Sequence, residues 1–199
     1  MVRMPVRPYH HGDLRAALLA SAERTLLEKG VAALSLRELA RDAGVSHAAP
    51  GRHFKDKQAL LDALALVGCE RMAEALEAAD VPDLPLEPRL TALATAYLDF
   101  AISNPELVEV MYARKHGPDV SEELAAAVER TVGPFVRLMA DAQERGEIVQ
   151  GDPESITLMA AASLHGTAAF AANGTFPPEV ALASVPTLVH HLLHGLKPR

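Results

Sequence analysis

The stretch that decides the fold spans residues 35–57 and reads SLRELARDAGVSHAAPGRHFKDK. Its first four residues, SLRE, fit a capping box, in which the serine hydroxyl and the glutamate carboxylate satisfy exposed amides, and they predict a short helix over 35–43. Gly44 allows a tight turn, and Ser46 can cap another short helix that Phe54 ends. Two short helices joined by a tight glycine turn are typical of a helix-turn-helix motif.

The residues on either side continue the helical pattern. Upstream, apolar residues at every fourth position predict a helix over 13–29, which Gly30 can end in the left-handed conformation. Downstream, Asp56 can cap a long helix whose apolar residues continue to Leu76. The three prolines within 80–88 then predict a connector, because a helix cannot run through that spacing.

The rest of the chain predicts five further helices, over 89–103, 105–112, 121–145, 153–173 and 178–193. No segment alternates between apolar and polar residues with the period of a strand. We therefore expect an all-α fold of two domains. A three-helix helix-turn-helix domain would occupy residues 1–60, and a second helical domain would occupy residues 61–199.

Composition excludes several classes of protein. Of the 199 residues, 49% are hydrophobic and 4% are aromatic, and the single cysteine, Cys69, can form no internal disulfide. The N-terminal MVRMPVRPYHHGD is not followed by an apolar run of leader length. The most apolar segment, 158–172, is shorter than the ~20 residues of a membrane span, so we interpret it as a buried or interface helix. These features predict a cytoplasmic protein.

Charge is divided unevenly along the chain, whose formal net charge is −7. Residues 1–60 carry 10 basic and 6 acidic side chains, whereas residues 61–199 carry 9 and 20. A basic segment on an acidic chain indicates a surface for nucleic acid, although a solvated face gives the same pattern. An N-terminal arm can follow a phosphate strand or remain a disordered tail, and its candidate residues are Arg3, Arg7, Tyr9, His10 and His11.

Residues 9–64, YHHGDLRAALLASAERTLLEKGVAALSLRELARDAGVSHAAPGRHFKDKQALLDAL, resemble the DNA-binding domain of the tetracycline-repressor (TetR) family of bacterial transcription regulators. The motifs that carry the resemblance are SLRELA before AGVS, and then RHFKDKQALL. Farther along, ASLHG at 162–166 looks like the Trp-His-Gly variety of the family's C-terminal domain, with Leu164 where tryptophan is usual. The resemblance implies a homodimer that binds a palindromic operator in double-stranded DNA.

A helix in the major groove reads base edges, whereas contacts to phosphate set its register. We expect the helix over 46–54 to present the readers, with Arg37 on the preceding helix best equipped for a bidentate guanine contact. The exposed candidates on the reading helix are His47, Ala48, Ala49, Arg52 and His53. The family resemblance implies contacts to the backbone or nearby bases from Ser35, Arg37, Ser46, His53 and Lys57. The two serines can instead act only as caps, and His53 can instead only pack.

One position in this segment departs from the family pattern. Family members commonly carry a tyrosine at the position of Gly51, which supplies an aromatic ring and a hydroxyl to a phosphate. Glycine supplies neither and weakens a short helix by ~1 kcal/mol relative to alanine. Pro50 also removes an amide donor. We therefore expect weaker or more context-dependent DNA binding than in relatives that carry tyrosine.

We expect the second domain to bind an effector and to pair with its own copy. The candidates for an apolar or mildly polar ligand are Tyr97, Phe100, Met111, Tyr112, Phe135, Met139, Met159, His165 and Phe170. The last two helices are the expected pairing surface, through Ala160, Ala161, Ser163, Gly166, Leu188, Val189, Leu192 and Leu193. Packing within one chain explains both sets of residues as well.

These features predict a transcriptional repressor that a small apolar ligand releases from its operator, with activation as the less expected outcome and no cofactor. A metal-responsive regulator is the alternative, because His190 and His194 are four residues apart beside His191, but such a site needs another ligand. An enzyme is not expected. The sequence has no Gly-rich phosphate loop, His-Glu-x-x-His pattern or nucleophile elbow.

Overall fold

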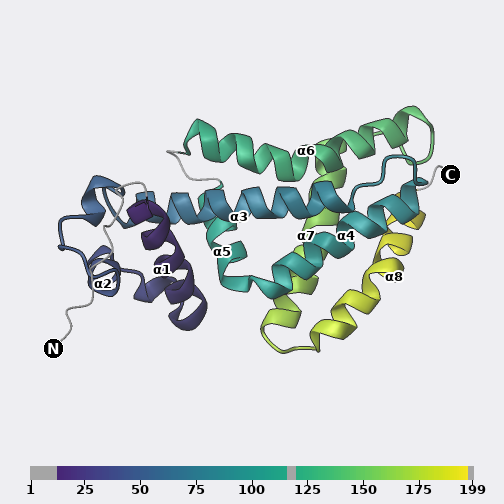
Figure 1. Ribbon diagram of the computed structural model, residues 1–199. Coiled ribbons are helices and arrows are strands. Elements are labelled where there is room, and N and C mark those ends of the chain that lie inside the picture. Colours follow the sequence, from purple (N-terminus) through teal and green to yellow (C-terminus); the bar gives the residue numbers. More distant parts are fainter. Residues whose placement is uncertain (1–12, 116–119, 197–199) are drawn as a thin grey trace.

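The computed structural model describes residues 13–115 and 120–196. In these residues the chain forms eight α-helices and two short 3-10 helices, with no strand, which confirms the all-α prediction. A small head contains α1 (Asp13–Lys29) and α2 (Leu36–Asp42), and the long helix α3 (Lys57–Ala79) runs from this head into a larger helical body (Figure 1). The N-terminal arm at residues 3–11 lies outside the described residues.

The head follows the sequence prediction closely at its first helix. α1 has the predicted bounds, and Gly30 after it has a φ of 74°, the left-handed conformation that glycine tolerates best. Ser35 has the extended backbone of an N-cap at the start of α2, but its side chain makes no capping hydrogen bond. The predicted capping box is therefore not formed, although the helix that it predicted is present.

The predicted helix over 46–54 is wrong as an α-helix. Two tight turns replace it: the amide of Ala49 donates to the carbonyl of Ser46 at 2.9 Å, and Pro50–Arg52 then forms the 3-10 helix η2. Proline has no amide hydrogen, so Pro50 cannot donate to Ser46 as the first α-helical hydrogen bond there would require. Phe54 does end this segment, and its side chain is buried in the core of the head.

The remaining helices correspond to the predicted ones with shifted ends. They are α4 (Leu86–Ser103), α5 (Pro105–Arg114), α6 (Glu122–Glu144), α7 (Pro153–Ala172) and α8 (Pro178–Leu196). The connector predicted over 80–88 is shorter, because α4 already includes Pro88 in its first turn. An amide there has no partner within the helix, so a proline costs little.

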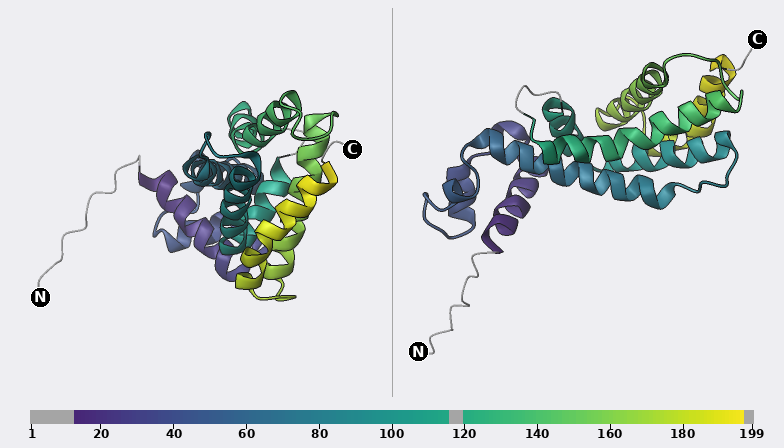
Figure 2. Two further views of the ribbon diagram at one scale, coloured as in Figure 1. Left: turned by 90° about the vertical axis from the view of Figure 1, so that its right-hand side faces the viewer. Right: turned by 90° about the horizontal axis from the view of Figure 1, so that it is seen from above.

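The body is built around α3. This helix packs against α4, α5 and α6, while α4 packs against α7 and α8, and α6 against α7 (Figure 2). The short helix α5 also contacts α1 of the head. Ion pairs hold α3 to its neighbours, among them Arg71 with Glu23 of α1, and Arg114 of α5 with Asp62 at 2.6 Å. α3 therefore runs through both head and body, and these ion pairs fix it to α1 of the head and to α5 of the body.

α7 differs from the other helices of the body because most of its apolar surface is uncovered. Its 20 residues are long and apolar enough to span a bilayer by length and composition alone, a test that core helices of soluble proteins also pass. Only 28% of its most apolar stretch is buried. Leu158, Met159 and Phe170 are among the most exposed large apolar residues that the structure describes. One side of α7 packs on the body, and the other presents apolar side chains outward.

The N-cap of α3 provides a test of this account. Asp56 accepts a hydrogen bond from the amide of Ala59 at 2.8 Å, so Asp56→Ala should lower the free energy of unfolding by about 1 kcal/mol in urea titrations. Asp56→Asn should leave it nearly unchanged, since asparagine caps as well. Asp83→Ala, at an exposed connector position, is the matched control. An equal loss of stability for Asp56→Asn and Asp56→Ala would contradict the capping role.

Candidate functional site

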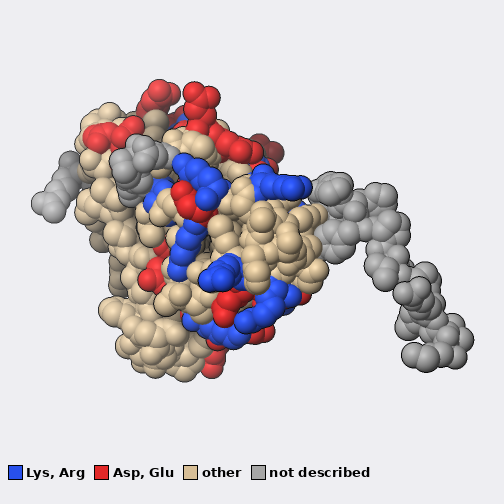
Figure 3. All heavy atoms as spheres, turned by 90° about the vertical axis from the view of Figure 1, so that its left-hand side faces the viewer, with Lys and Arg blue, Asp and Glu red and all other residues tan. Residues whose placement is uncertain are grey.

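The head exposes most of the residues that the sequence predicts to meet DNA. Figure 3 shows lysine and arginine side chains over this end of the molecule, with acidic side chains between and around them. The exposed candidates are Arg37, Ser46, His47, Ala48, Arg52 and Lys57. Those that are half-buried are Ser35, Ala49 and His53. The ammonium of Lys57 also donates to the carbonyl of Val31 at 2.8 Å, which holds it against the head.

The turns at 46–53 change how these residues are presented. A regular helix would align His47, Ala48 and Arg52 along one groove-facing side, whereas the two turns place them on an irregular projection. Arg37, by contrast, lies on a formed helix and keeps its guanidinium exposed. Arg37 is therefore the candidate reader with the best-defined position in the structure.

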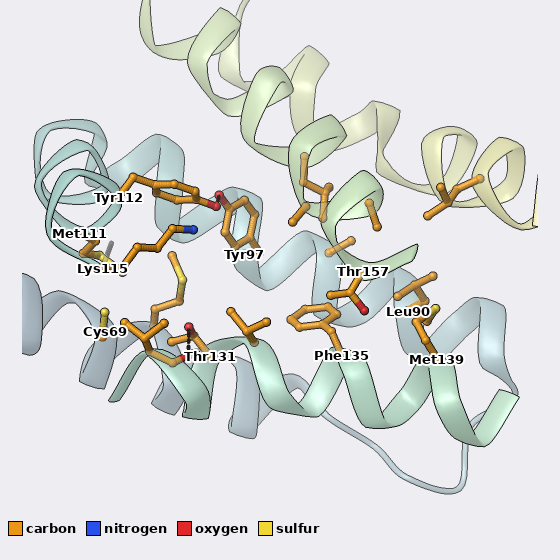
Figure 4. Close-up of a pocket in the computed structure, with 18 of the residues that line it drawn as sticks. Cys69, Leu90, Tyr97, Met111, Tyr112, Lys115, Thr131, Phe135, Met139 and Thr157 are labelled. Carbon is orange, nitrogen blue, oxygen red and sulfur yellow. Dashed lines mark hydrogen bonds between the residues drawn. The ribbon is translucent and has the colours of Figure 1, made fainter. Parts of the chain in front are cut away.

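An internal cavity of about 90 Å³ lies in the body (Figure 4). Helices α3 to α8 all contribute side chains to its wall. The residues that line it are Cys69, Met72, Leu90, Ala94, Tyr97, Met111, Tyr112, Lys115, Val128, Thr131, Val132, Phe135, Met139, Thr157, Ala160, Ala161, Leu164, Leu188, Val189 and Leu192. The wall is overwhelmingly apolar, as in sites that hold small organic molecules.

Five of the nine predicted ligand residues line this cavity, namely Tyr97, Met111, Tyr112, Phe135 and Met139. His165 lies behind the two tyrosines and lines a shallower groove on their other side. Phe100 packs against the core outside the cavity wall. Met159 and Phe170 are 63% and 52% exposed on α7, so the expectation that they point inward is corrected. α7 is apolar on all sides, which leaves no pattern to distinguish its inner face.

One end of the cavity carries a cluster of polar groups. The hydroxyls of Tyr97 and Tyr112 are 3.0 Å apart, and the Tyr97 hydroxyl is 3.3 Å from Nδ1 of His165. The rings of Tyr112 and His165 stack with centroids 4.2 Å apart. The Lys115 ammonium lies 3.7 Å from the centroid of the Tyr112 ring, and Figure 4 shows it turned toward the two tyrosine oxygens. The cluster is thus a cation beside two linked hydroxyls.

Burial favours the neutral form of Tyr97, Lys115 and His165. Burial raises the pKa of Tyr97, and it lowers the pKa of Lys115 and of His165, whose pKa the nearby Lys115 charge lowers further. Burial also raises the pKa of the Cys69 thiol to about 11. At neutral pH Tyr97, His165 and Cys69 are therefore neutral, and Lys115 is the cationic side chain beside them.

The opposite end of the cavity lies near Leu90 and Met139 and is apolar except for Thr157 (Figure 4). The Thr157 side chain is buried, and its hydroxyl has no hydrogen-bond partner among the described residues. Sequence reasoning missed Thr157, Cys69 and Lys115. In a sequence, a lysine at the end of a helix is interpreted as a cation that interacts with the helix dipole. The three-dimensional structure is needed to show that Lys115 instead lines the cavity.

Most of the residues expected to form a pairing surface are half-buried in the single chain. Val189 and Leu193 are buried, and Leu188, Leu192, Ala160 and Ala161 are half-buried. All of these except Leu193 line the cavity. Ser163 is exposed and Gly166 is half-buried. The outward surface of α7 is instead apolar at Leu158, Met159 and Phe170.

The histidines of α8 do not form a metal site with other described residues. His190 and His194 stack with ring centroids 5.9 Å apart, and Nδ1 of His190 lies 3.0 Å from a carboxylate oxygen of Glu87. Across residues 13–115 and 120–196, no group of three or more histidine, cysteine, aspartate or glutamate side chains is placed to hold a metal ion. The paired histidine and glutamate therefore tie α8 to α4.

The end of α5 connects the cavity with the head. Met111 and Tyr112 line the cavity, and Arg114, two residues farther on, donates to Asp62 of α3 at 2.6 Å. With its amide oriented to suit its neighbours, Gln58 also accepts from the Arg114 guanidinium, and Gln58 lies in the first turn of α3. A displacement of α5 at the cavity would therefore be transmitted to the start of α3.

The single cysteine reports directly on the cavity. Because the pKa of Cys69 is raised to about 11, the reactive thiolate is scarce at neutral pH. We expect native protein to react with iodoacetamide far more slowly than urea-unfolded protein at pH 8, and its rate to rise with pH up to about 11. Mass spectrometry of quenched samples measures both rates. Equal rates in native and unfolded protein would contradict the buried position of the thiol.

Comparisons with known proteins agree with this geometry. Residues 18–64 match the model of the bacterial regulatory proteins of the tetR family, and residues 90–196 match the tetracyclin repressor-like C-terminal domain. An HTH-type transcriptional regulator of Mycobacterium tuberculosis is 27% identical over 142 residues, which cover 68% of this chain. The matched region spans only 60% of the length of that regulator.

Solved structures also resemble the chain over nearly its full length. A protein of unknown function from Rhodococcus sp. RHA1 is 43% identical, with 97% of this chain and all of that chain covered and a TM-score of 0.82. A tetR-family regulatory protein from the same organism is 25% identical over 94% of this chain and 98% of its own, with a TM-score of 0.72. Together with the matched helix-turn-helix domain and helical body, these relationships establish that the chain belongs to the TetR family of DNA-binding transcriptional regulators.

Proposed function

We propose that this regulator is a homodimeric repressor that binds a palindromic operator and is released when a small molecule enters the cavity of the body. The observation that carries the proposal is the position of α5. This helix contributes Met111 and Tyr112 to the cavity, contacts α1 of the head, and is pinned to α3 by Arg114. A change at the cavity therefore has a short, continuous path to the DNA-contact surface.

The size of the cavity supports a change of shape on binding. Its volume of about 90 Å³ is well below the roughly 300–1,000 Å³ of pockets that hold drug-sized ligands. A ligand larger than a few water molecules must separate the helices that line it. The ligand would then bind the separated arrangement better than the present one, and such differential affinity is what shifts a conformational equilibrium.

The outward side of α7 supports the proposed dimer. Leu158, Met159 and Phe170 are between 52% and 69% exposed, which leaves an apolar strip on one side of a 20-residue helix. Pairing two such strips about a two-fold axis would bury them. The two heads would then be held at a fixed separation, as a palindromic operator requires. A DNA-bound regulator of this kind would act in the cytoplasm.

Selection of bound sequences from a random DNA pool at about 0.15 M salt tests this function, because salt suppresses purely electrostatic binding. We expect a palindromic motif with two equivalent half-sites. Arg37→Ala should relax the preference at one base pair of each half-site and weaken binding by about 1–3 kcal/mol per contact. Arg130→Ala, on the surface of the body, is the control and should select the same motif. Folded wild-type protein that enriches no sequence would contradict the proposal.

Position 51 offers a gain-of-function test. No atom lies within 4 Å of a Cβ built on Gly51, so the site can accept a larger side chain. Gly51→Tyr should tighten binding to the selected DNA about fivefold, since one added hydrogen bond to phosphate contributes about 1 kcal/mol.

Two effects can produce that gain: a more stable turn and a direct contact of the tyrosine with phosphate. Gly51→Ala separates them, because it stabilises the turn without adding a ring or hydroxyl. Fluorescence anisotropy with labelled DNA measures all three proteins. Binding by Gly51→Tyr that is no tighter than binding by Gly51→Ala would contradict a direct phosphate contact.

A further inference from the structure

We propose that the ligand of the cavity is a carboxylic acid with an apolar body, whose carboxylate binds the Lys115 ammonium and the Tyr112 hydroxyl. The apolar body would lie along the cavity toward Leu90 and Met139. The inference rests on the proposed function only in that the cavity takes a small molecule. It adds the chemical class of that molecule and the side chains that select it.

The first argument is the charge of the wall. Lys115 is the one cation that lines the cavity among the described residues, and no described carboxylate lines it. Within residues 13–115 and 120–196, no carboxylate oxygen lies within 4 Å of its ammonium nitrogen. Among the described residues the half-buried ammonium has the face of the Tyr112 ring as a partner but no anion, so its lost hydration is compensated only in part. An anion supplied by the ligand restores that compensation.

The second argument is the direction of the neighbouring hydrogen bonds. When Nδ1–H of His165 donates to the Tyr97 oxygen, the Tyr97 hydroxyl donates to the Tyr112 oxygen, 3.0 Å away. The hydroxyl hydrogen of Tyr112 is then free to donate to a carboxylate held at Lys115, whose ammonium lies 3.7 Å from the centroid of the Tyr112 ring. His165 acts in this arrangement as a positioning residue that sets the direction of the chain of hydroxyls.

The charge balance favours a carboxylate over a dianion. One ammonium neutralises one negative charge, and the neutral hydroxyls add directional donors without adding charge. A phosphate monoester would place a second negative charge in the same apolar enclosure without a cation to match it. The monoanionic carboxylate therefore fits the charge of this wall.

The third argument is the shape and polarity of the rest of the cavity. Figure 4 shows the wall extending from the Lys115 cluster past Phe135 to Leu90 and Met139, so a bound molecule would have its charged group at one end. The unpartnered hydroxyl of Thr157 is the exception at the far end. It is a second fixed point at which a polar substituent of the ligand would gain a hydrogen bond.

Matched acids and alcohols test the proposal by calorimetric titration of the full chain. The probes are octanoate with 1-octanol and 4-phenylbutyrate with 4-phenylbutanol, because each pair differs only at the head group. We expect at least one acid to bind about tenfold or more tightly than its alcohol, as a hydrogen bond to a charged group predicts.

Three variants assign that preference. Lys115→Met keeps the length of the side chain and removes its charge, and it should abolish the preference for the acid while leaving alcohol binding unchanged. Lys115→Arg should retain part of the preference. Lys29→Met removes an exposed charge from α1 and should behave as wild type.

Protection of Cys69 gives a second readout that does not depend on DNA. A bound acid should slow alkylation of this cavity-lining thiol in the wild-type protein, and Lys115→Met should lose the protection at the same acid concentration. The acid and alcohol binding equally, the preference surviving in Lys115→Met, or no acid binding or protecting would each overturn the assignment. The DNA selection described above would be unaffected by any of these results, so failure of this inference is distinguishable from failure of the proposed function.

Discussion

The contact between Arg114 and Asp62 is the interaction on which the proposed link between cavity and head depends. It fixes the end of α5, which forms part of the cavity wall, to the first turns of α3, which belong to the head. The guanidinium is largely shielded from solvent and has Gln58 as a further partner, so it is better defined than an ordinary surface ion pair. α5 also contacts α1, so the head meets the body through this helix as well as through α3.

The cavity combines two physical properties that suit a switch. It is small and almost wholly apolar, so under the proposed mechanism a ligand larger than the cavity would move the surrounding helices apart. At one end it contains a cation whose hydration is reduced by burial, beside hydroxyls that already hydrogen-bond to each other. The apolar wall supplies general affinity through burial, and the polar cluster supplies discrimination, because a mismatched head group leaves buried polar groups without partners.

Local sequence signals predicted a helix boundary correctly where a single residue determines it. Asp56 caps α3 as predicted, and Gly30 ends α1 in the left-handed conformation. The α-helix predicted over 46–54 was wrong. Ser46 favoured the start of a helix, but Pro50, four residues later, has no amide hydrogen to donate to the Ser46 carbonyl. In the cavity, aromatic and sulfur-containing residues were partly predictable by type. Lys115 was not, because its direction depends on how α5 packs against its neighbours.

Reciprocal coupling tests the connection between cavity and head most directly. If a ligand weakens DNA binding, DNA must weaken binding of that ligand by the same factor. The measurement is the affinity of the acid that binds best, titrated into the protein alone and into the protein saturated with its selected DNA. Coupling through α5 predicts weaker binding to the DNA complex, by a factor that falls toward one when Arg114→Met and Asp62→Asn separate α5 from α3. Identical affinities for the free and DNA-bound wild-type protein would contradict the account.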